Sequence, residues 1–131
     1  CHRPAETIMA SMCSLAQHTT EGWSTKFVGE TIGADSLETW SRGLERFNTV
    51  RAQHDPAQFY DMDYFDLIAD PVATVEAIYR HFGIDLTDEA RGAMQASHEA
   101  SKQGPRAPKH SYSLADYGLT DEQVKQRFKG L

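Results

Sequence analysis

Residues 2–11 read HRPAETIMAS, and they place a strand-to-helix junction near the start of the chain. Pro4 suits the first position of a helix, where its missing N–H removes no hydrogen bond, and it restricts Arg3 to an extended conformation. Beyond the proline, apolar residues recur at helical spacing and predict a helix of about 13 residues with one buried face. These residues are Ile8, Met9, Met12, Leu15 and Ala16.

The residues on either side of this junction suit a bound anion. The first turn of a helix offers unpaired backbone N–H groups, and an arginine adds a fork of donors that matches a phosphate. Ser11 lies eight residues after Arg3, which is about 12 Å along a regular helix. An irregular first turn shortens this distance, and the arginine side chain reaches along the axis, so one anion can contact both residues. The pair therefore predicts a phosphate site. The alternative is that Arg3 forms a surface ion pair and Ser11 only packs against a neighbouring helix.

Further along the chain, a loop, a helix and a short strand are expected. Residues 18–34 contain three glycines and no sustained hydrophobic period, so they predict a loop. Residues 35–54 carry apolar side chains at helical spacing and predict an amphipathic helix. The apolar positions are Leu37, Trp40, Leu44, Phe47 and Val50. Residues 59–65, FYDMDYF, alternate aromatic or methionine side chains with aspartates and predict a short strand.

Two further helices follow this expected strand. Asp70 is a candidate N-cap with Pro71 at the first helical position, and Gly83 supplies the C-terminal stop of the helix between them. Residues 87–101 predict a second helix, which begins with acidic side chains where the helix dipole favours them.

The last part of the chain changes character. Residues 102–118 contain prolines, glycines and several basic side chains, and we expect them to be irregular and not to pack as a regular element. Thr120 and Gln123 then have the spacing of a capping box, which predicts a short helix through Phe128.

Composition narrows the classes of protein to which the chain can belong. It has 131 residues, of which 40% are apolar and 24% charged, in the range of one soluble domain with one core. A net charge of −6 argues against binding to a nucleic-acid backbone. No membrane span or signal peptide is evident, so we expect a cytoplasmic protein. Cys1 and Cys13 are too few for a disulfide framework, and no spacing matches a metal site.

The order of the expected elements is that of an α/β fold. Strands alternate with helices, but two strands do not make a self-sufficient sheet. We therefore expect further strands of the same sheet outside these residues.

The junction at Arg3 resembles the 3′-phosphate-binding motif of the cytosolic-type sulfotransferases. In that family an arginine at the end of a strand is followed eight positions later by a serine on the next helix. Here these positions are Arg3 and Ser11, with PAET between them, although bacterial members often have Arg-Asp-Pro where this chain has Arg-Pro-Ala. The resemblance implies that both side chains hold the 3′-phosphate of 3′-phosphoadenosine 5′-phosphosulfate (PAPS).

Two later stretches are also similar to this family. Residues 64–84, YFDLIADPVATVEAIYRHFGI, resemble its Tyr-Glu-Asp-Leu segment, acidic-Pro turn and following helix. This match implies that Tyr64 lies near the adenine of PAPS; the alternative is a tyrosine that only faces the core. Residues 109–124, KHSYSLADYGLTDEQV, are similar to the ending of bacterial members.

The resemblance implies a fold and a reaction. The fold is a P-loop-kinase-like three-layer α/β structure, of which residues 1–131 would be a single partial domain, the C-terminal half, mostly helical with one or two short parallel strands. The reaction is sulfuryl transfer from PAPS to a hydroxyl or amine of a small-molecule, lipid or carbohydrate acceptor, without a metal. The phosphosulfate loop, its lysine and the catalytic base are expected before residue 1, so we expect residues 1–131 alone to be inactive.

Other residues are candidates for the same site. Arg106, Lys109 and His110, with Lys102, are candidates for a second phosphate contact, although a solvated basic loop explains them equally well. His18 is a candidate base on the acceptor side. An alternative for the whole chain is a helix-rich interaction module that keeps the architecture and catalyses nothing. A P-loop kinase fragment fits less well, because its nucleotide would have no 3′-phosphate for Arg3 to bind.

Overall fold

The chain forms two compact units of helices. The computed structural model describes residues 1–23, 28–103 and 112–131, and these contain six α-helices and two short 3₁₀ helices. The first unit combines Cys1–Arg3 with His54–Lys109, and the second combines Pro4–Gln53 with His110–Leu131. Each unit is described by itself below.

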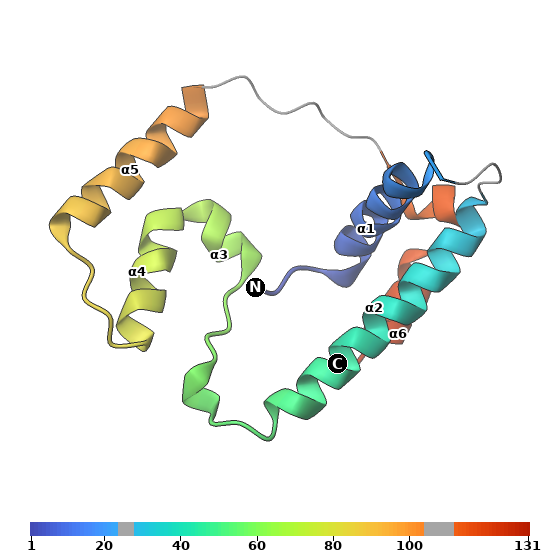
Figure 1. The fold of residues 1–131 in the computed structure, drawn as a ribbon, viewed down its shortest axis with the longest axis horizontal. Helices are drawn as coiled ribbons and strands as arrows, with labels where there is room; N and C mark the ends of the chain where they lie inside the picture. Colours follow the sequence, from blue (N-terminus) through green and yellow to red (C-terminus); the bar gives the residue numbers. More distant parts are fainter. Residues whose placement is uncertain (24–27, 104–111) are drawn as a thin grey trace. The chain divides into compact units, whose positions relative to one another are not determined.

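The second unit contains the hydrophobic core. Helices α1 (Ala5–Thr20), α2 (Gly29–Arg51) and α6 (Asp121–Phe128) lie side by side, with the 3₁₀ helix η2 (Leu114–Tyr117) against α1 and α2 (Figure 1). Seven buried side chains form the core: Met9, Ala10, Cys13, Leu114, Tyr117, Leu119 and Val124. The stripe expected on α1 is therefore buried in part, at Met9, while Ile8 and Leu15 are exposed.

The expected loop at residues 18–34 is wrong at both ends. Helix α1 continues to Thr20, and α2 already begins at Gly29 rather than at residue 35. A Cβ atom on Gly33 would lie 2.0 Å from the carbonyl oxygen of Tyr117, so the first turns of α2 pack directly on the backbone of η2. The glycines in this stretch predicted a loop, but in the structure their lack of a side chain lets α2 pack closely against η2.

The described ends of residues 102–118 are more ordered than expected, while residues 104–111 lie outside the described residues. The whole stretch was predicted to be irregular, but α5 continues to Gln103 and Leu114–Tyr117 form η2, with both ends of η2 buried in the core. Ser113 and Asp116 cap η2 reciprocally. The predicted capping box before α6 is confirmed, since the Gln123 amide N–H donates to the Thr120 hydroxyl at 3.2 Å and the Thr120 amide N–H donates to Gln123 Oε1 at 2.8 Å.

The described part of the first unit contains three α-helices, and the middle one, α4, contacts the other two. The 3₁₀ helix η1 (Pro56–Gln58) precedes α3 (Tyr64–Ala69), α4 (Pro71–His81) and α5 (Asp88–Gln103), and α4 contacts both α3 and α5. None of the described side chains of this unit is fully buried. Phe65, Ile68, Phe82 and Ile84 remain exposed.

The predicted ends of α4 are confirmed. The Ala73 N–H donates to Asp70 Oδ1 at 2.9 Å, which makes Asp70 the N-cap, and Pro71 follows as the first helical residue. Gly83 ends the helix with φ of +64°, and the Ile84 N–H donates to the Tyr79 carbonyl at 2.9 Å. This is the left-handed glycine stop that the sequence predicts.

The strand expected at residues 59–65 is wrong. The segment is extended as far as Asp63, but Tyr64 begins α3. Residues 1–23, 28–103 and 112–131 contain no strand, and the expected parallel pairing is reduced to one isolated parallel bridge between His2 and Asp63. The alternating aspartates do not mark a two-faced strand, because Asp63 turns back to cap the following helix: the Phe65 N–H donates to its Oδ1 at 2.6 Å.

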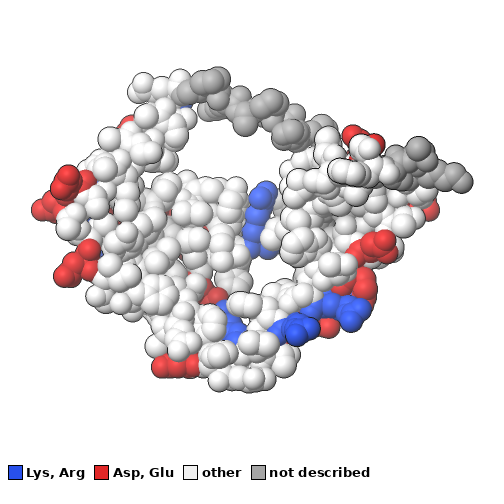
Figure 2. Space-filling model, in the orientation of Figure 1, with Lys and Arg blue, Asp and Glu red and all other residues white. Residues whose placement is uncertain are grey.

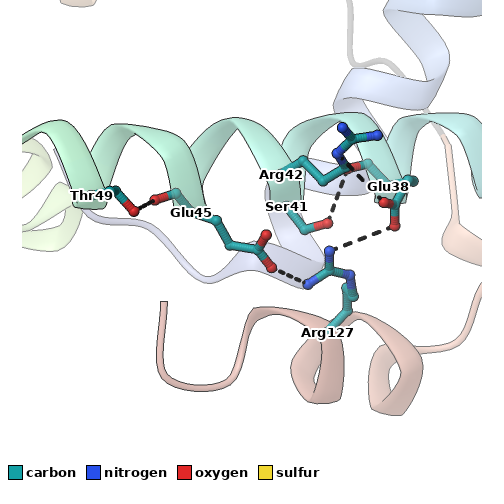
Figure 3. Close-up of polar contacts among 6 residues, drawn as sticks. All are labelled: Glu38, Ser41, Arg42, Glu45, Thr49 and Arg127. Atoms are coloured by element: carbon teal, nitrogen blue, oxygen red, sulfur yellow. Dashed lines mark hydrogen bonds and ion pairs between the residues drawn. The ribbon is translucent and has the colours of Figure 1, made fainter.

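Charged side chains of both signs line α2. In Figure 2 acidic and basic side chains lie next to one another along this helix. Arg127 of α6 joins two of the acids: its Nη1 lies 2.6 Å from Glu45 Oε1 and its Nη2 lies 3.6 Å from Glu38 Oε2 (Figure 3). The hydrogen bond and charge of Glu45 raise the pKa of Arg127. No helix within the described ranges is long and apolar enough to cross a membrane.

Candidate functional site

Two segments of the first unit that lie far apart in the sequence pair in parallel at one bridge. The His2 N–H donates to the Met62 carbonyl at 2.6 Å, and the Tyr64 N–H donates to the His2 carbonyl at 2.8 Å. These two hydrogen bonds make the parallel bridge between His2 and Asp63. They set Arg3, the next residue of the first segment, beside Tyr64.

The Arg3 guanidinium lies over the ring of Tyr64. Its Cζ is 4.5 Å from the centre of the ring, which is a cation–π contact. Contacts of this kind contribute about 0.5–1 kcal/mol at exposed sites. The contact therefore holds an exposed arginine over one place on the surface of the first unit.

Two aspartates support this arrangement from the same extended segment. His2 Nε2 lies 2.8 Å from Asp61 Oδ1, so the side chain of the residue before Arg3 is held as well as its backbone. Asp63 caps α3 and thereby fixes Tyr64 as the first helical residue. Both ends of the cation–π contact are consequently attached to backbone that is hydrogen-bonded.

The hydrogen-bond donors of Arg3 lie in the plane of its guanidinium. The contact with Tyr64 uses the face of the guanidinium, whereas the N–H groups point outward in its plane. Among the described residues of the first unit, no carboxylate forms an ion pair with Arg3. The phosphate contact of Arg3 and the alternative of a surface ion pair both stay predictions.

Ser11 belongs to the other unit. It lies on α1, where it is half-buried beside the buried Ala10, whereas Arg3 belongs to the first unit. Their convergence on one anion stays a prediction.

At the start of α1 no side chain caps the helix, and the Pro4 carbonyl accepts from the N–H groups of Thr7 and Ile8. A helix start of this kind leaves its first amide groups for solvent or an anion.

His18 lies in the last turn of α1. Its Nδ1 is 2.7 Å from the carbonyl oxygen of Ser14. A carbonyl oxygen only accepts, so Nδ1 carries the proton of this bond and Nε2 is the unprotonated nitrogen of the neutral ring. A base requires such an unprotonated nitrogen. The hydrogen bond to Ser14 is also an ordinary contact at a helix end, so the role of His18 stays a prediction.

The basic candidates near the end of α5 are only partly described. Lys102 forms an ion pair with Glu99, with Nζ and Oε1 2.6 Å apart, and this contact lowers the pKa of Glu99. Arg106, Lys109 and His110 lie outside the described residues. Among the side chains that are described, no group of three or more His, Cys, Asp or Glu could hold a metal ion.

The sequence interpretation missed the contact between Arg3 and Tyr64. It assigned the two residues to different parts of a nucleotide, the 3′-phosphate and the adenine. No spacing signal connects them, because the contact follows from backbone pairing between distant segments. The alternation in FYDMDYF predicted a strand, which the structure does not form, although Asp63 just before Tyr64 is extended.

Comparison with known proteins gives a consistent result. Residues 1–88 match the model of a sulfotransferase family. Among solved structures, sulfotransferase STF1 from Mycobacterium tuberculosis H37Rv matches with a TM-score of 0.82 and 69% identity, over 99% of this chain and 32% of that one. Sulfotransferase STF9 from Mycobacterium avium matches in fold, with a TM-score of 0.81 and 22% identity, over 97% of this chain and 33% of that one. The chain thus spans about a third of each. No curated protein matches it.

Proposed function

Because the chain belongs to the sulfotransferase family, we propose that it is the 3′-phosphate-binding, C-terminal part of an enzyme that transfers a sulfuryl group from PAPS. In this proposal Arg3 and Ser11 contact the 3′-phosphate, and Tyr64 lies beside the same nucleotide. Arg106, Lys109 and His110 remain candidates for a second phosphate contact.

The observation that carries the proposal is the state of Arg3. Its guanidinium lies over the Tyr64 ring, with Cζ 4.5 Å from the ring centre. A planar guanidinium can donate two parallel hydrogen bonds to a phosphate, and a contact with its face leaves the donating edge uncovered by the ring. The residues present therefore fit a nucleotide that carries a phosphate at this place.

The reaction follows from the donor. An oxygen or nitrogen of the acceptor attacks the sulfur atom in line, the bond between sulfur and the bridging phosphate oxygen breaks, and a base takes the acceptor proton. The products are the sulfated acceptor and adenosine 3′,5′-bisphosphate. Arg3 and Ser11 bind and orient the nucleotide in this scheme, while the base and the phosphosulfate lysine are proposed to precede residue 1.

The acceptor and the location of the enzyme complete the proposal. We place the acceptor among small molecules, lipids and carbohydrates with a hydroxyl or amine. We place the enzyme in the cytoplasm, where the free thiols of Cys1 and Cys13 would stay reduced.

Calorimetric titration of the complete protein with adenosine 3′,5′-bisphosphate tests the proposal. Binding that is lost or strongly weakened in Arg3→Ala, with Arg80→Ala of α4 as a matched control, supports the site. Equal affinity of the Arg3→Ala variant and the unaltered protein would refute it. Tighter binding of ADP than of the bisphosphate would favour a kinase, and no nucleotide binding would favour an interaction module.

A further inference from the structure

We infer that Tyr64 is a positioning residue: its ring holds the Arg3 guanidinium, and through Arg3 it sets the preference for a nucleotide with a 3′-phosphate. The inference rests on the proposed function. It adds to the role implied by the resemblance, in which Tyr64 lies near the adenine.

The geometry assigns the ring this task. Arg3 Cζ lies 4.5 Å from the centre of the Tyr64 ring, and no ion pair joins Arg3 to a carboxylate among the described residues of the first unit. A free arginine side chain samples many rotamers, and binding a phosphate requires one of them. The ring restricts the arginine rotamers before the ligand binds. It contacts the face of the guanidinium, whereas the N–H groups that donate hydrogen bonds to a phosphate lie along its edge.

The backbone around the ring keeps it in place. Tyr64 is the first residue of α3, where Asp63 caps the helix, and its N–H donates to the His2 carbonyl at 2.8 Å. The ring edge also meets Phe65, with centroids 5.8 Å apart and planes at 69°. Tyr64 thus has fixed surroundings, and within the described residues of the first unit its ring is the contact recorded for the Arg3 side chain.

The test measures nucleotide preference rather than activity. The complete protein and its variants are titrated with adenosine 3′,5′-bisphosphate and with adenosine 5′-phosphate, which lacks the 3′-phosphate. Tyr64→Leu should weaken binding of the bisphosphate by about five- to thirty-fold more than binding of the 5′-phosphate, as expected for loss of a cation–π contact that becomes desolvated on binding. Tyr64→Phe keeps the ring and should keep the nucleotide preference of the unaltered protein.

Two controls separate positioning from structural damage. Tyr60→Leu makes the same change four residues earlier, where the ring meets His81 rather than Arg3, and should leave the preference unchanged. In the Arg3→Ala background, Tyr64→Leu should no longer alter the preference between the two nucleotides, because Tyr64 sets that preference through Arg3.

The outcomes distinguish this inference from the function on which it rests. If Arg3→Ala leaves bisphosphate affinity unchanged, the proposed phosphate site is wrong and the inference falls with it. If Arg3→Ala weakens binding but Tyr64→Leu weakens both nucleotides equally, or still alters the preference in the Arg3→Ala background, the ring does not act through Arg3 and only the inference is overturned. Should Tyr64→Leu fail to fold, Tyr64→Phe still decides: loss of the preference would show that the hydroxyl is required, against the inference.

Discussion

The Tyr117 hydroxyl donates a hydrogen bond of 2.8 Å to Oε1 of Gln17, across 100 positions of sequence. Tyr117 is buried at the end of η2, and Gln17 lies on α1, the helix that carries Ser11. The C-terminal stretch that resembles bacterial sulfotransferase endings therefore holds the predicted phosphate helix. Within the described residues, the contact that Tyr117 of this stretch makes with α1 is a structural one.

Tyr117→Phe removes this hydrogen bond and should lower the free energy of unfolding of the complete protein by about 0.5–1.5 kcal/mol. Because the ring stays in the core, packing is preserved and only the hydrogen bond is lost. Urea unfolding measures the change. The matched control is Tyr112→Phe, at a partly exposed tyrosine, and an equal loss in both variants would contradict the assignment.

Two glycines of α2 should respond oppositely to alanine. Gly33→Ala places a Cβ 2.0 Å from the Tyr117 carbonyl oxygen, and overpacking against backbone costs about 1–3 kcal/mol. At Gly43, where nothing lies within 4 Å of the added Cβ, alanine should stabilise by about 0.5–1 kcal/mol through helix propensity. Thermal unfolding of both variants checks the contrast; a stable Gly33→Ala protein would mean that α2 does not rest on η2.

Arg127→Gln should destabilise the protein more than Arg42→Gln. The Arg127 side chain is 30% exposed and joins Glu45 to Glu38, whereas the Arg42 side chain is 73% exposed and lies 3.8 Å from Glu38 (Figure 3). Loss of Arg127 leaves two carboxylates without their shared cation, and salt screens exposed pairs strongly. Melting temperatures in low and high salt measure both effects. We expect the difference between the variants to shrink in high salt, and a difference independent of salt would argue for packing instead.

The Cys13 thiol should be unreactive in the folded protein. It is fully buried on α1, and burial raises its pKa, against a smaller opposite effect of the hydrogen bond with Ser36. A raised pKa leaves less thiolate at pH 8, and burial also blocks the reagent. Iodoacetamide labelling followed by peptide mass spectrometry should show slow modification of Cys13 in buffer and fast modification in urea. Equal rates in the two conditions would contradict a buried thiol.

The termini of several elements could be predicted from the sequence, because they depend on neighbouring residues. Asp70 and Pro71 begin α4, Gly83 ends it, and Thr120 caps α6, all as the sequence predicts. Each of these features is decided by the chemistry of a side chain and the amide groups within four residues of it. The prediction that Arg3 binds a phosphate also depended on neighbouring residues, namely the junction at Pro4 and the spacing from Arg3 to Ser11.

Tertiary structure decided what local chemistry left open. Gly29 and Gly33 lie in a helix because the space they leave is filled by η2, so contact between helices outweighs their low helix propensity. Similarly, Tyr64 is the start of a helix and the support of Arg3 because the backbone of His2 pairs with that of Asp63. Such contacts form only when segments that are distant in the sequence meet. Their free energy depends on both segments at once, so the sequence of either segment alone does not predict it.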